Sequence, residues 1–113
     1  MGYSKSIRFL PETLRSLGFA SIGAAYMGVG TAIDHPARMV IIQNYTNDQL
    51  LFSFDGVNDH ITLSSLSQIV LDISSNKTTD DGFYMAEGDR LYVKEVVGPT
   101  SGSVYFSVFY GKD

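Results

Sequence analysis

Two histidines are the first residues of this sequence to examine for chemistry, and His35 and His60 are the only ones it has. His60 follows Asp59, and Ser64 and Ser65 lie a few residues further on, so together they have the residue types of a hydrolase triad. In a triad the carboxylate orients the histidine, whereas adjacent residues on a strand point to opposite faces. The spacing therefore predicts polar residues at the edge of a loop and no nucleophilic site.

The turn Asp55-Gly56-Val57-Asn58-Asp59 is a candidate metal site, because three of its side chains carry oxygen. Asp80 and Asp81 add two carboxylates. Calcium takes about six to eight oxygen ligands, and the spacing does not match an EF-hand. Asp, Asn and Gly are also the residues from which β-turns are built. We therefore expect a turn and no bound metal.

Other patterns that carry chemistry are incomplete. Asp72, Glu87 and Glu95 could act in pairs on a glycosidic bond, but no spacing singles out a pair. No Gly-Lys-Ser/Thr follows the glycines, so there is no phosphate-binding loop. Asn44-Tyr45-Thr46 and Asn76-Lys77-Thr78 match the glycosylation pattern, which acts only in a secretory pathway. We expect neither an enzyme nor a cofactor.

The composition restricts the class of partner. A length of 113 residues suits one domain, and a net charge of -4 argues against a nucleic-acid-binding face. Only 18% of the residues are charged, so less of the surface than usual is charged. The absence of cysteine excludes disulfides and thiolate metal sites.

One uncharged stretch approaches the length of a membrane span. Ser16–Ile33 contains 18 residues without a charge. Its glycines, alternating with Ala, Ser and Thr, leave few large apolar groups, so burial in lipid would gain little. The first residues do not lead into a leucine-rich signal core. We expect no membrane contact.

Residues 1–33 differ from the rest of the chain. Pro11–Leu17 begins with Pro, has Glu12 at its positive end and is followed by Gly18, a pattern that predicts a short helical turn. Phe19–Ile33 is small and Gly-rich, which predicts an extended segment that crosses a neighbouring surface. We therefore divide the chain into an N-terminal arm, 1–33, that packs on neighbouring subunits, and a β-sandwich domain, 34–113.

After Asp34 the chain is a series of short apolar runs closed by Gly, Asn or Asp turns. No segment there has room for a helix of normal length. The pattern predicts an all-β fold, an antiparallel β-sandwich or jelly-roll-like arrangement of about seven or eight strands, with an extended Gly-rich N-terminal arm. The predicted strands are Arg38–Asn44, Gln49–Phe54, His60–Leu63, Gln68–Ile73, Phe83–Ala86, Arg90–Val96 and Ser103–Tyr110.

The last of these strands is apolar on both faces. Val104, Phe106 and Val108 point one way, and Tyr105 and Phe109 point the other. One face can join the core, so we expect the second to lie against another subunit. Apolar side chains of the arm and one tyrosine of the predicted 83–86 strand join this interface in our prediction. The candidate interface residues are Phe19, Ile22, Tyr26, Met27, Val29, Tyr84, Tyr105 and Phe109.

Several segments carry a family resemblance. They are Arg15–Ile33, Arg38–Gly56, Leu71–Lys77, Gly88–Lys94 and Thr100–Gly111, and the second includes Ile-Gln-Asn-Tyr-Thr-Asn-Asp and Phe-Ser-Phe-Asp-Gly. Over nearly its whole length the chain resembles small structural proteins of tailed bacteriophages, mostly short-tailed ones. The resemblance implies a virion protein in repeated copies that holds neighbouring proteins together. It contains no catalytic signature and assigns no functional residue.

We therefore expect a non-enzymatic, homo-oligomeric virion subunit, assembled in the bacterial cytoplasm, with copies of itself and other virion proteins as partners. A neck or tail connector component is expected first, because a long arm suits threading between stacked rings. A capsid cement or decoration protein is the first alternative. The second is a carbohydrate- or receptor-binding module that uses the loops at Asp55–Asp59 and Ser74–Gly82.

Overall fold

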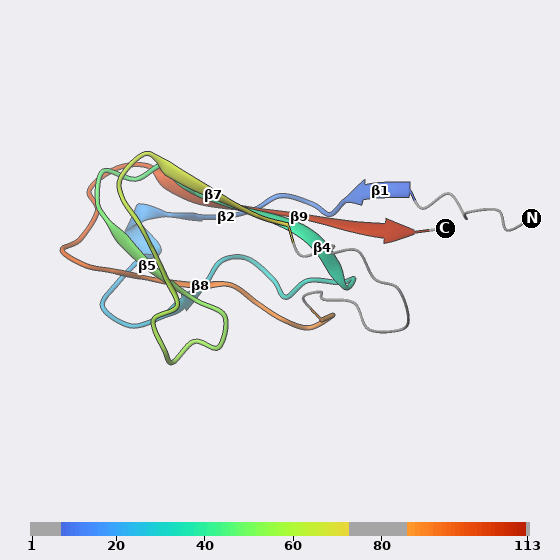
Figure 1. Ribbon diagram of the computed structural model, residues 1–113. Coiled ribbons are helices and arrows are strands. Elements are labelled where there is room, and N and C mark those ends of the chain that lie inside the picture. Colours follow the sequence, from blue (N-terminus) through green and yellow to red (C-terminus); the bar gives the residue numbers. More distant parts are fainter. Residues whose placement is uncertain (1–7, 73–85, 113) are drawn as a thin grey trace, which may run out of the picture.

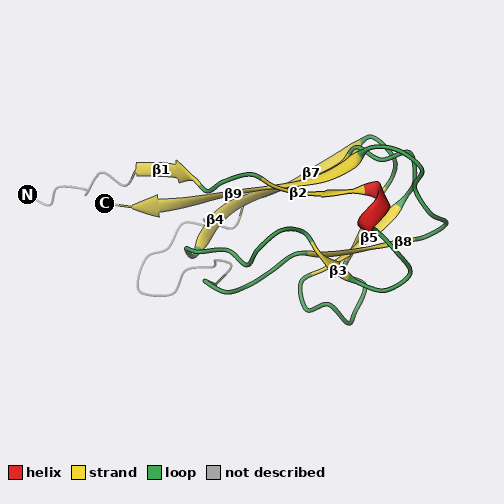
Figure 2. Cartoon of the chain, turned by 180° about the vertical axis from the view of Figure 1, so that it is seen from behind, coloured by secondary structure: helices red, strands yellow, loops and turns green. Residues whose placement is uncertain are grey.

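The computed structural model describes residues 8–72 and 86–112 and shows two antiparallel β-sheets packed face to face (Figure 1). A single 3-10 turn, η1 (Phe19–Ser21), interrupts the strands of these ranges (Figure 2). The strands are β1 (Arg8–Pro11), β2 (Arg15–Gly18), β3 (Met27–Gly28), β4 (Ala37–Asn44), β5 (Leu50–Ser53), β6 (Ile61–Leu63), β7 (Ser67–Asp72), β8 (Tyr92–Glu95) and β9 (Ser103–Lys112). The all-β sandwich predicted from the sequence is confirmed.

The strands pair in a nested pattern. The first sheet has the order β1-β9-β4-β7. On the same edge as β1, β2 pairs with the first half of β9, whereas β1 pairs with its last residues. The second sheet has the order β3-β8-β5-β6. Since β4 pairs with β9 and β5 with β8, the chain forms a long hairpin wound over two layers, as in a jelly roll.

The hydrophobic core lies between the two sheets. Alternate residues of β4 and β9 point inward, and Val40, Ile42, Val104, Phe106 and Val108 have almost no exposed surface. The facing layer supplies Leu50, Phe52, Leu63, Leu91 and Val93. One face of each sheet is therefore fully used by the core.

The helical turn predicted for Pro11–Leu17 is wrong. β1 pairs with Phe109–Lys112 and β2 pairs with Ser103–Phe106, so this segment forms an interrupted edge strand along β9. Between the two strands the Glu12 amide donates to the Val108 carbonyl at 2.8 Å. A helix of two turns has little stability of its own, and backbone pairing with β9 is the stronger alternative.

The rest of the predicted arm also packs on its own sandwich. Ile22, Val29 and Ile33 belong to the core. The Val29 amide donates to the Leu91 carbonyl at 2.8 Å, and the Ile33 amide donates to Asp89 at 2.9 Å. The division at residue 33 is thus corrected for the described residues, because 8–33 supply three strands and part of the core. The small residues of this segment allow its backbone to approach the chain's own strands closely.

Six of the seven strands predicted after Asp34 are present, with ends that differ by two residues or fewer. The seventh, Phe83–Ala86, lies almost wholly outside the described residues, and Ala86 itself is in a turn closed by a 3.0 Å bond from the Asp89 amide. In the described ranges no helix is long and apolar enough to cross a membrane.

Candidate interaction surfaces

The side chains considered for catalysis have other partners. Asp59 pairs with the Lys94 ammonium at 3.2 Å and accepts a hydrogen bond from the Tyr26 hydroxyl. The Tyr26 bond, followed by that from Lys94, lowers the pKa of Asp59, whereas burial and the Asp59 bond raise the pKa of Tyr26. His60 lies 3.8 Å from Asp55 instead, and the serines follow β6 at its other end. These residues form a surface ion-pair cluster.

The Asp55 carboxylate is used by its own loop. Its Oδ1 accepts hydrogen bonds from the Val57 and Asn58 amides at 2.8 and 2.9 Å and from the Ser53 hydroxyl at 2.8 Å. Its Oδ2 accepts from the Asn58 side chain at 2.9 Å. These bonds, those to the Asn58 and Val57 amides first, hold the pKa of Asp55 well below its usual range. Within the described residues no group of three acidic or histidine side chains could hold a metal.

A partly buried polar cluster joins the β1–β2 break to the loop before β4. The Glu12 carboxylate accepts hydrogen bonds from Arg15 and His35, both at 2.8 Å, and from the Asp34 amide at 3.1 Å. The His35 ring stacks on Tyr110 with centroids 3.7 Å apart. Burial acts to raise the pKa of Glu12, but the bonds from His35, Asp34 and Arg15 outweigh it and lower the pKa. We call Glu12, Arg15 and His35 the Glu12 cluster.

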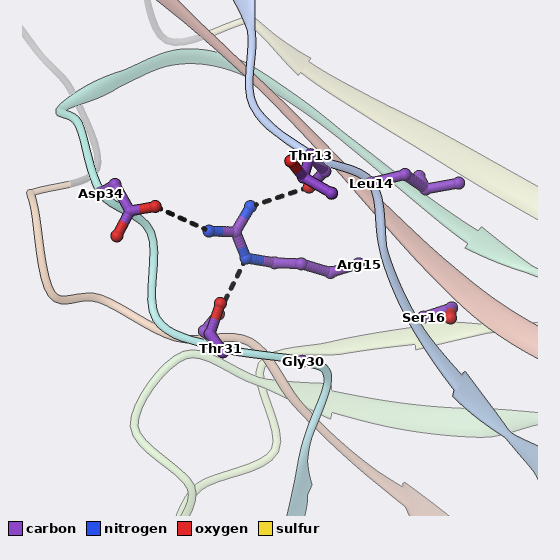
Figure 3. Close-up of a pocket in the computed structure, with 7 residues that line it drawn as sticks. All are labelled: Thr13, Leu14, Arg15, Ser16, Gly30, Thr31 and Asp34. Atoms are coloured by element: carbon purple, nitrogen blue, oxygen red, sulfur yellow. Dashed lines mark hydrogen bonds and ion pairs between the residues drawn. The ribbon is translucent and has the colours of Figure 1, made fainter.

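A hollow of about 360 Å³ lies beside this cluster, lined by Thr13, Leu14, Arg15, Ser16, Gly30, Thr31 and Asp34 (Figure 3). Arg15 is the cation among these residues, but its guanidinium donates to the carbonyls of Thr31, Ala32 and Thr13 at 2.8, 2.9 and 3.2 Å, besides Glu12. The hydrogen bonds of the Arg15 guanidinium therefore hold β2 to the loop 30–34.

The outward-facing side of the first sheet carries apolar side chains beside polar ones, among which Gln68 and Asp72 are exposed. In cross-strand register, Phe109 lies beside Met39, and Ser107, Ile41 and Val70 form the next row. Figures 1 and 2 show this sheet as the upper layer, with no described strand or helix above it. We define the outer face as Met39, Ile41, Tyr45, Val70, Tyr105 and Phe109, of which Val70 is 48% exposed.

Two glutamines and two tyrosines of the outer face contact one another. Gln43 donates to the Tyr45 hydroxyl at 3.1 Å and to Gln68 Oε1 at 3.0 Å. The Tyr45 and Tyr105 rings meet edge to face with centroids 5.9 Å apart. A partner confined to the row of Ile41 and Val70 has apolar groups to bury, whereas a wider contact also meets the exposed Asp72 opposite Met39.

The predicted interface residues do not lie together in the structure. Tyr105 and Phe109 lie on the outer face, while Phe19 and Met27 are exposed elsewhere and Tyr26 belongs to the ion-pair cluster. Ile22 and Val29 are buried in the core of this chain, which corrects their assignment to an interface. Tyr84 lies outside the described residues.

Sequence reasoning missed the β4 and β7 contribution to the outer face. The continuous apolar run Met39–Ile42 predicts a strand buried on both faces, whereas Ile41 is half-buried and points outward. Gln43 and Gln68, aligned with Tyr105 across the sheet, are the signal that this side meets solvent or a partner.

Comparison with protein family models, curated proteins and solved structures found no match to this chain.

Proposed function

We propose that this protein is a non-enzymatic structural subunit that assembles through its outer face. The observation that supports the proposal is the apolar outer side of the first sheet, where Ile41, Val70 and Tyr105 lie opposite the core side. An antiparallel sheet that meets water on one side normally carries polar residues there. Apolar residues on that side favour a protein contact.

The strength of such a contact can be bounded. Full burial of a Val or Ile side chain contributes roughly 1.5–3 kcal/mol, and residues that start half-buried contribute about half of that. Ile41 and Val70 with the Met, Phe and two Tyr side chains of the outer face, less the costs of association, suit a contact of modest affinity. Repetition in a symmetric particle then makes many modest contacts strong together.

The particle that we propose is a bacteriophage virion, and the sequence resemblance is the reason. In this proposal the protein is a homo-oligomeric component of the neck or tail connector, and its partners are copies of itself and other virion proteins. The alternative is a capsid cement protein, which would also assemble through the outer face.

A carbohydrate- or receptor-binding module receives less support. The Asp55 carboxylate, which would bind sugar hydroxyls, accepts hydrogen bonds from its own loop. The Tyr26 ring faces the Lys94 ammonium at 4.7 Å, and the Tyr92 ring faces Arg90 at 5.8 Å. These aromatic faces already have cations against them and are poor stacking platforms.

The test of assembly is the mass in solution by light scattering behind a sizing column. We expect the unmodified protein to exceed its monomer mass of 12.4 kDa and Val70→Lys to return to it. Burying an unpaired ammonium weakens a contact by about 3 kcal/mol, roughly a hundredfold in Kd. Val57→Lys is the matched control, because Val57 is 75% exposed on a loop of the other sheet.

Retention of the oligomer by Val70→Lys, or its loss in the Val57→Lys control, would contradict a contact through the outer face. The virion assignment has its own test, which is mass spectrometry of phage particles purified from the cells that produce this protein. We expect the protein in a fixed ratio to the major capsid protein. Its absence from washed particles would reject the assignment.

A further inference from the structure

The turn after β5 contains a dipeptide whose own groups can react with each other. In Asp55-Gly56, a bond between the side-chain carboxyl carbon and the next backbone nitrogen closes a five-membered imide ring. Gly56 has no side chain to hinder that nitrogen. As the new bond forms, the hydrogen of the nitrogen leaves together with the carboxyl OH as water. Water then opens the ring at either carbonyl, which restores aspartate or gives isoaspartate, whose backbone runs through the former side chain.

Ser53 binds the nitrogen that would attack. The Gly56 amide donates to Ser53 Oγ at 2.9 Å, and the Asp55 amide donates to the same oxygen at 3.1 Å. Ser53 is the last residue of β5 and has no exposed surface, so its hydroxyl lies away from water. The Gly56 hydrogen must therefore leave a shielded acceptor before the ring can close.

The carboxyl group that would be attacked is held in its unreactive form. Ring closure expels one carboxyl oxygen as water, and this step requires a proton on the carboxyl. Both oxygens of Asp55 instead accept hydrogen bonds, Oδ1 from the Ser53 hydroxyl and the Val57 and Asn58 amides, and Oδ2 from the Asn58 side chain. Such bonds favour the ionised carboxylate, which a nitrogen attacks poorly.

The turn is also fixed against its surroundings. A Cβ placed on Gly56 would lie 3.4 Å from the Tyr92 ring of β8. His60 Nε2 lies 3.8 Å from Asp55 Oδ2, while its Nδ1 accepts a hydrogen bond from the Phe54 amide at 3.1 Å. The imide ring ties the Asp55 side chain to the backbone, so it cannot keep the bonds of the carboxylate. The turn must therefore open before the ring forms.

We infer that Asp55-Gly56 is a latent site of isoaspartate formation and that Ser53 keeps it closed in the folded protein. Ser53 acts as a positioning residue, because it accepts the Gly56 hydrogen and donates to the Asp55 carboxylate. Isomerisation would add an atom to the backbone of the turn and would move the carboxylate away from its amide partners. The inference concerns a single chain and does not depend on the proposed assembly.

The rate of isomerisation in the folded and the unfolded chain is the first test. The protein is incubated at neutral pH with and without guanidinium chloride, and isoaspartate is counted by enzymatic methylation and peptide chromatography. Trypsin releases Asp55 in peptide 39–77 and the second Asp-Gly, Asp81-Gly82, in peptide 78–90, where it serves as a reference. Unfolded, the two sites should react at similar rates. Folded, Asp55 should react about a hundredfold more slowly, since the bonds from the Gly56, Val57 and Asn58 amides must break first and each contributes roughly a factor of five.

Ser53→Ala is the second test. It removes the acceptor of the Gly56 hydrogen and a donor to the carboxylate, so we expect isomerisation in the folded variant to be about twentyfold faster. Ser65→Ala is the matched control, because its hydroxyl donates to the Thr46 carbonyl beyond the other end of β6. It should leave the rate at Asp55 unchanged. Far-UV circular dichroism checks that both variants are folded.

Each other outcome contradicts a specific statement. Isoaspartate at Asp81 but not at Asp55 in the unfolded chain would mean that there is no latent site. Equal rates at Asp55 in the folded and unfolded chain would mean that the turn gives no protection, and equal rates in the unmodified protein and folded Ser53→Ala would mean that Ser53 does not supply it. If Ser53→Ala does not fold, hydrogen exchange of the Gly56 amide in the unmodified protein decides. Slow exchange would support the inference, and exchange as fast as in an unstructured peptide would overturn it.

Discussion

Replacement of Asn44 by Ala should destabilise this fold more than any exposed polar substitution. Asn44 ends β4 with no exposed surface. Its amide donates to the carbonyls of Asp48, Leu63 and Ser64 at 2.9, 3.0 and 3.1 Å. Its Oδ1 accepts from the amide and hydroxyl of Thr46 at 3.0 and 2.7 Å. One side chain therefore joins the loop after β4 to the end of β6.

The expected loss follows from the groups left without a partner. A buried donor or acceptor that loses its partner costs roughly 1–3 kcal/mol. The Thr46 amide, the Thr46 hydroxyl and the Leu63 carbonyl lose Asn44 in a buried setting, although the hydroxyl keeps the Asp48 carbonyl as an acceptor. The Asp48 and Ser64 carbonyls lie nearer to solvent. We therefore expect a loss of about 3–5 kcal/mol, a large part of the 5–15 kcal/mol that is typical of a domain.

Urea unfolding followed by tyrosine fluorescence and circular dichroism measures this loss, since the chain has seven Tyr and no Trp. Asn47→Ala is the matched control, because Asn47 lies three residues away but is exposed. It should lose about 1 kcal/mol or less. An Asn44→Ala loss equal to that of Asn47→Ala, with an unchanged m-value, would refute the argument. Such a result would mean that water replaces the Asn44 bonds.

Three further predictions concern charge and backbone. The pKa of Glu12 lies below its ordinary 4.5, so its carboxylate stabilises the fold above that pH and this contribution is lost as the pH falls further. The free energy of unfolding of Glu12→Gln should therefore differ most from that of the unmodified protein near pH 7, and the two should converge in acid. An equal difference at both pH values in urea unfolding would contradict this. Gly102→Ala at φ of +92° places Cβ in a clash with the Tyr45 carbonyl oxygen, whereas Gly88→Ala at +94° meets open space. We expect a loss of about 1 kcal/mol for Gly88→Ala and several times more for Gly102→Ala in urea unfolding, and equal losses would disprove the clash. Leu66→Asn should raise the free energy of unfolding by about 1 kcal/mol, because Asn tolerates a positive φ, and a lower melting temperature would show that Leu66 packs.

The strands after Asp34 could be predicted because local signals mark both their ends. β4 ends before an Asn-Asp turn, and β5 ends at Asp55-Gly56, where only a turn fits. The N-terminal strands lack such signals. Glu12 and Arg15 are spaced three apart, as in a helical ion pair, and only the structure shows that they meet across a break between two strands.

The candidate surfaces could be predicted only where the alternation of residues within one strand separates its two faces. Tyr105 and Phe109 could be placed on a second face because Ser103–Tyr110 alternates visibly. The placement of the exposed Leu66 and Val97 at one end could not be predicted, since Leu66 lies between two serines and Val97 follows the end of the predicted strand Arg90–Val96. Their meeting at one end depends on long-range contacts such as that between Asp48 and Gly98, which are 50 residues apart.

The central place of β9 determines when this protein can fold. Its partners β1, β2 and β4 all precede it in the chain, and Arg8 pairs with Lys112 across 104 positions. During synthesis β4 has only β7 to pair with in the first sheet, and β1 and β2 have no strand beside them until β9 leaves the ribosome. Pairing between such distant segments is slow. The nascent chain therefore keeps its apolar strands exposed until a single late step closes the sheet, and it needs protection from aggregation until then.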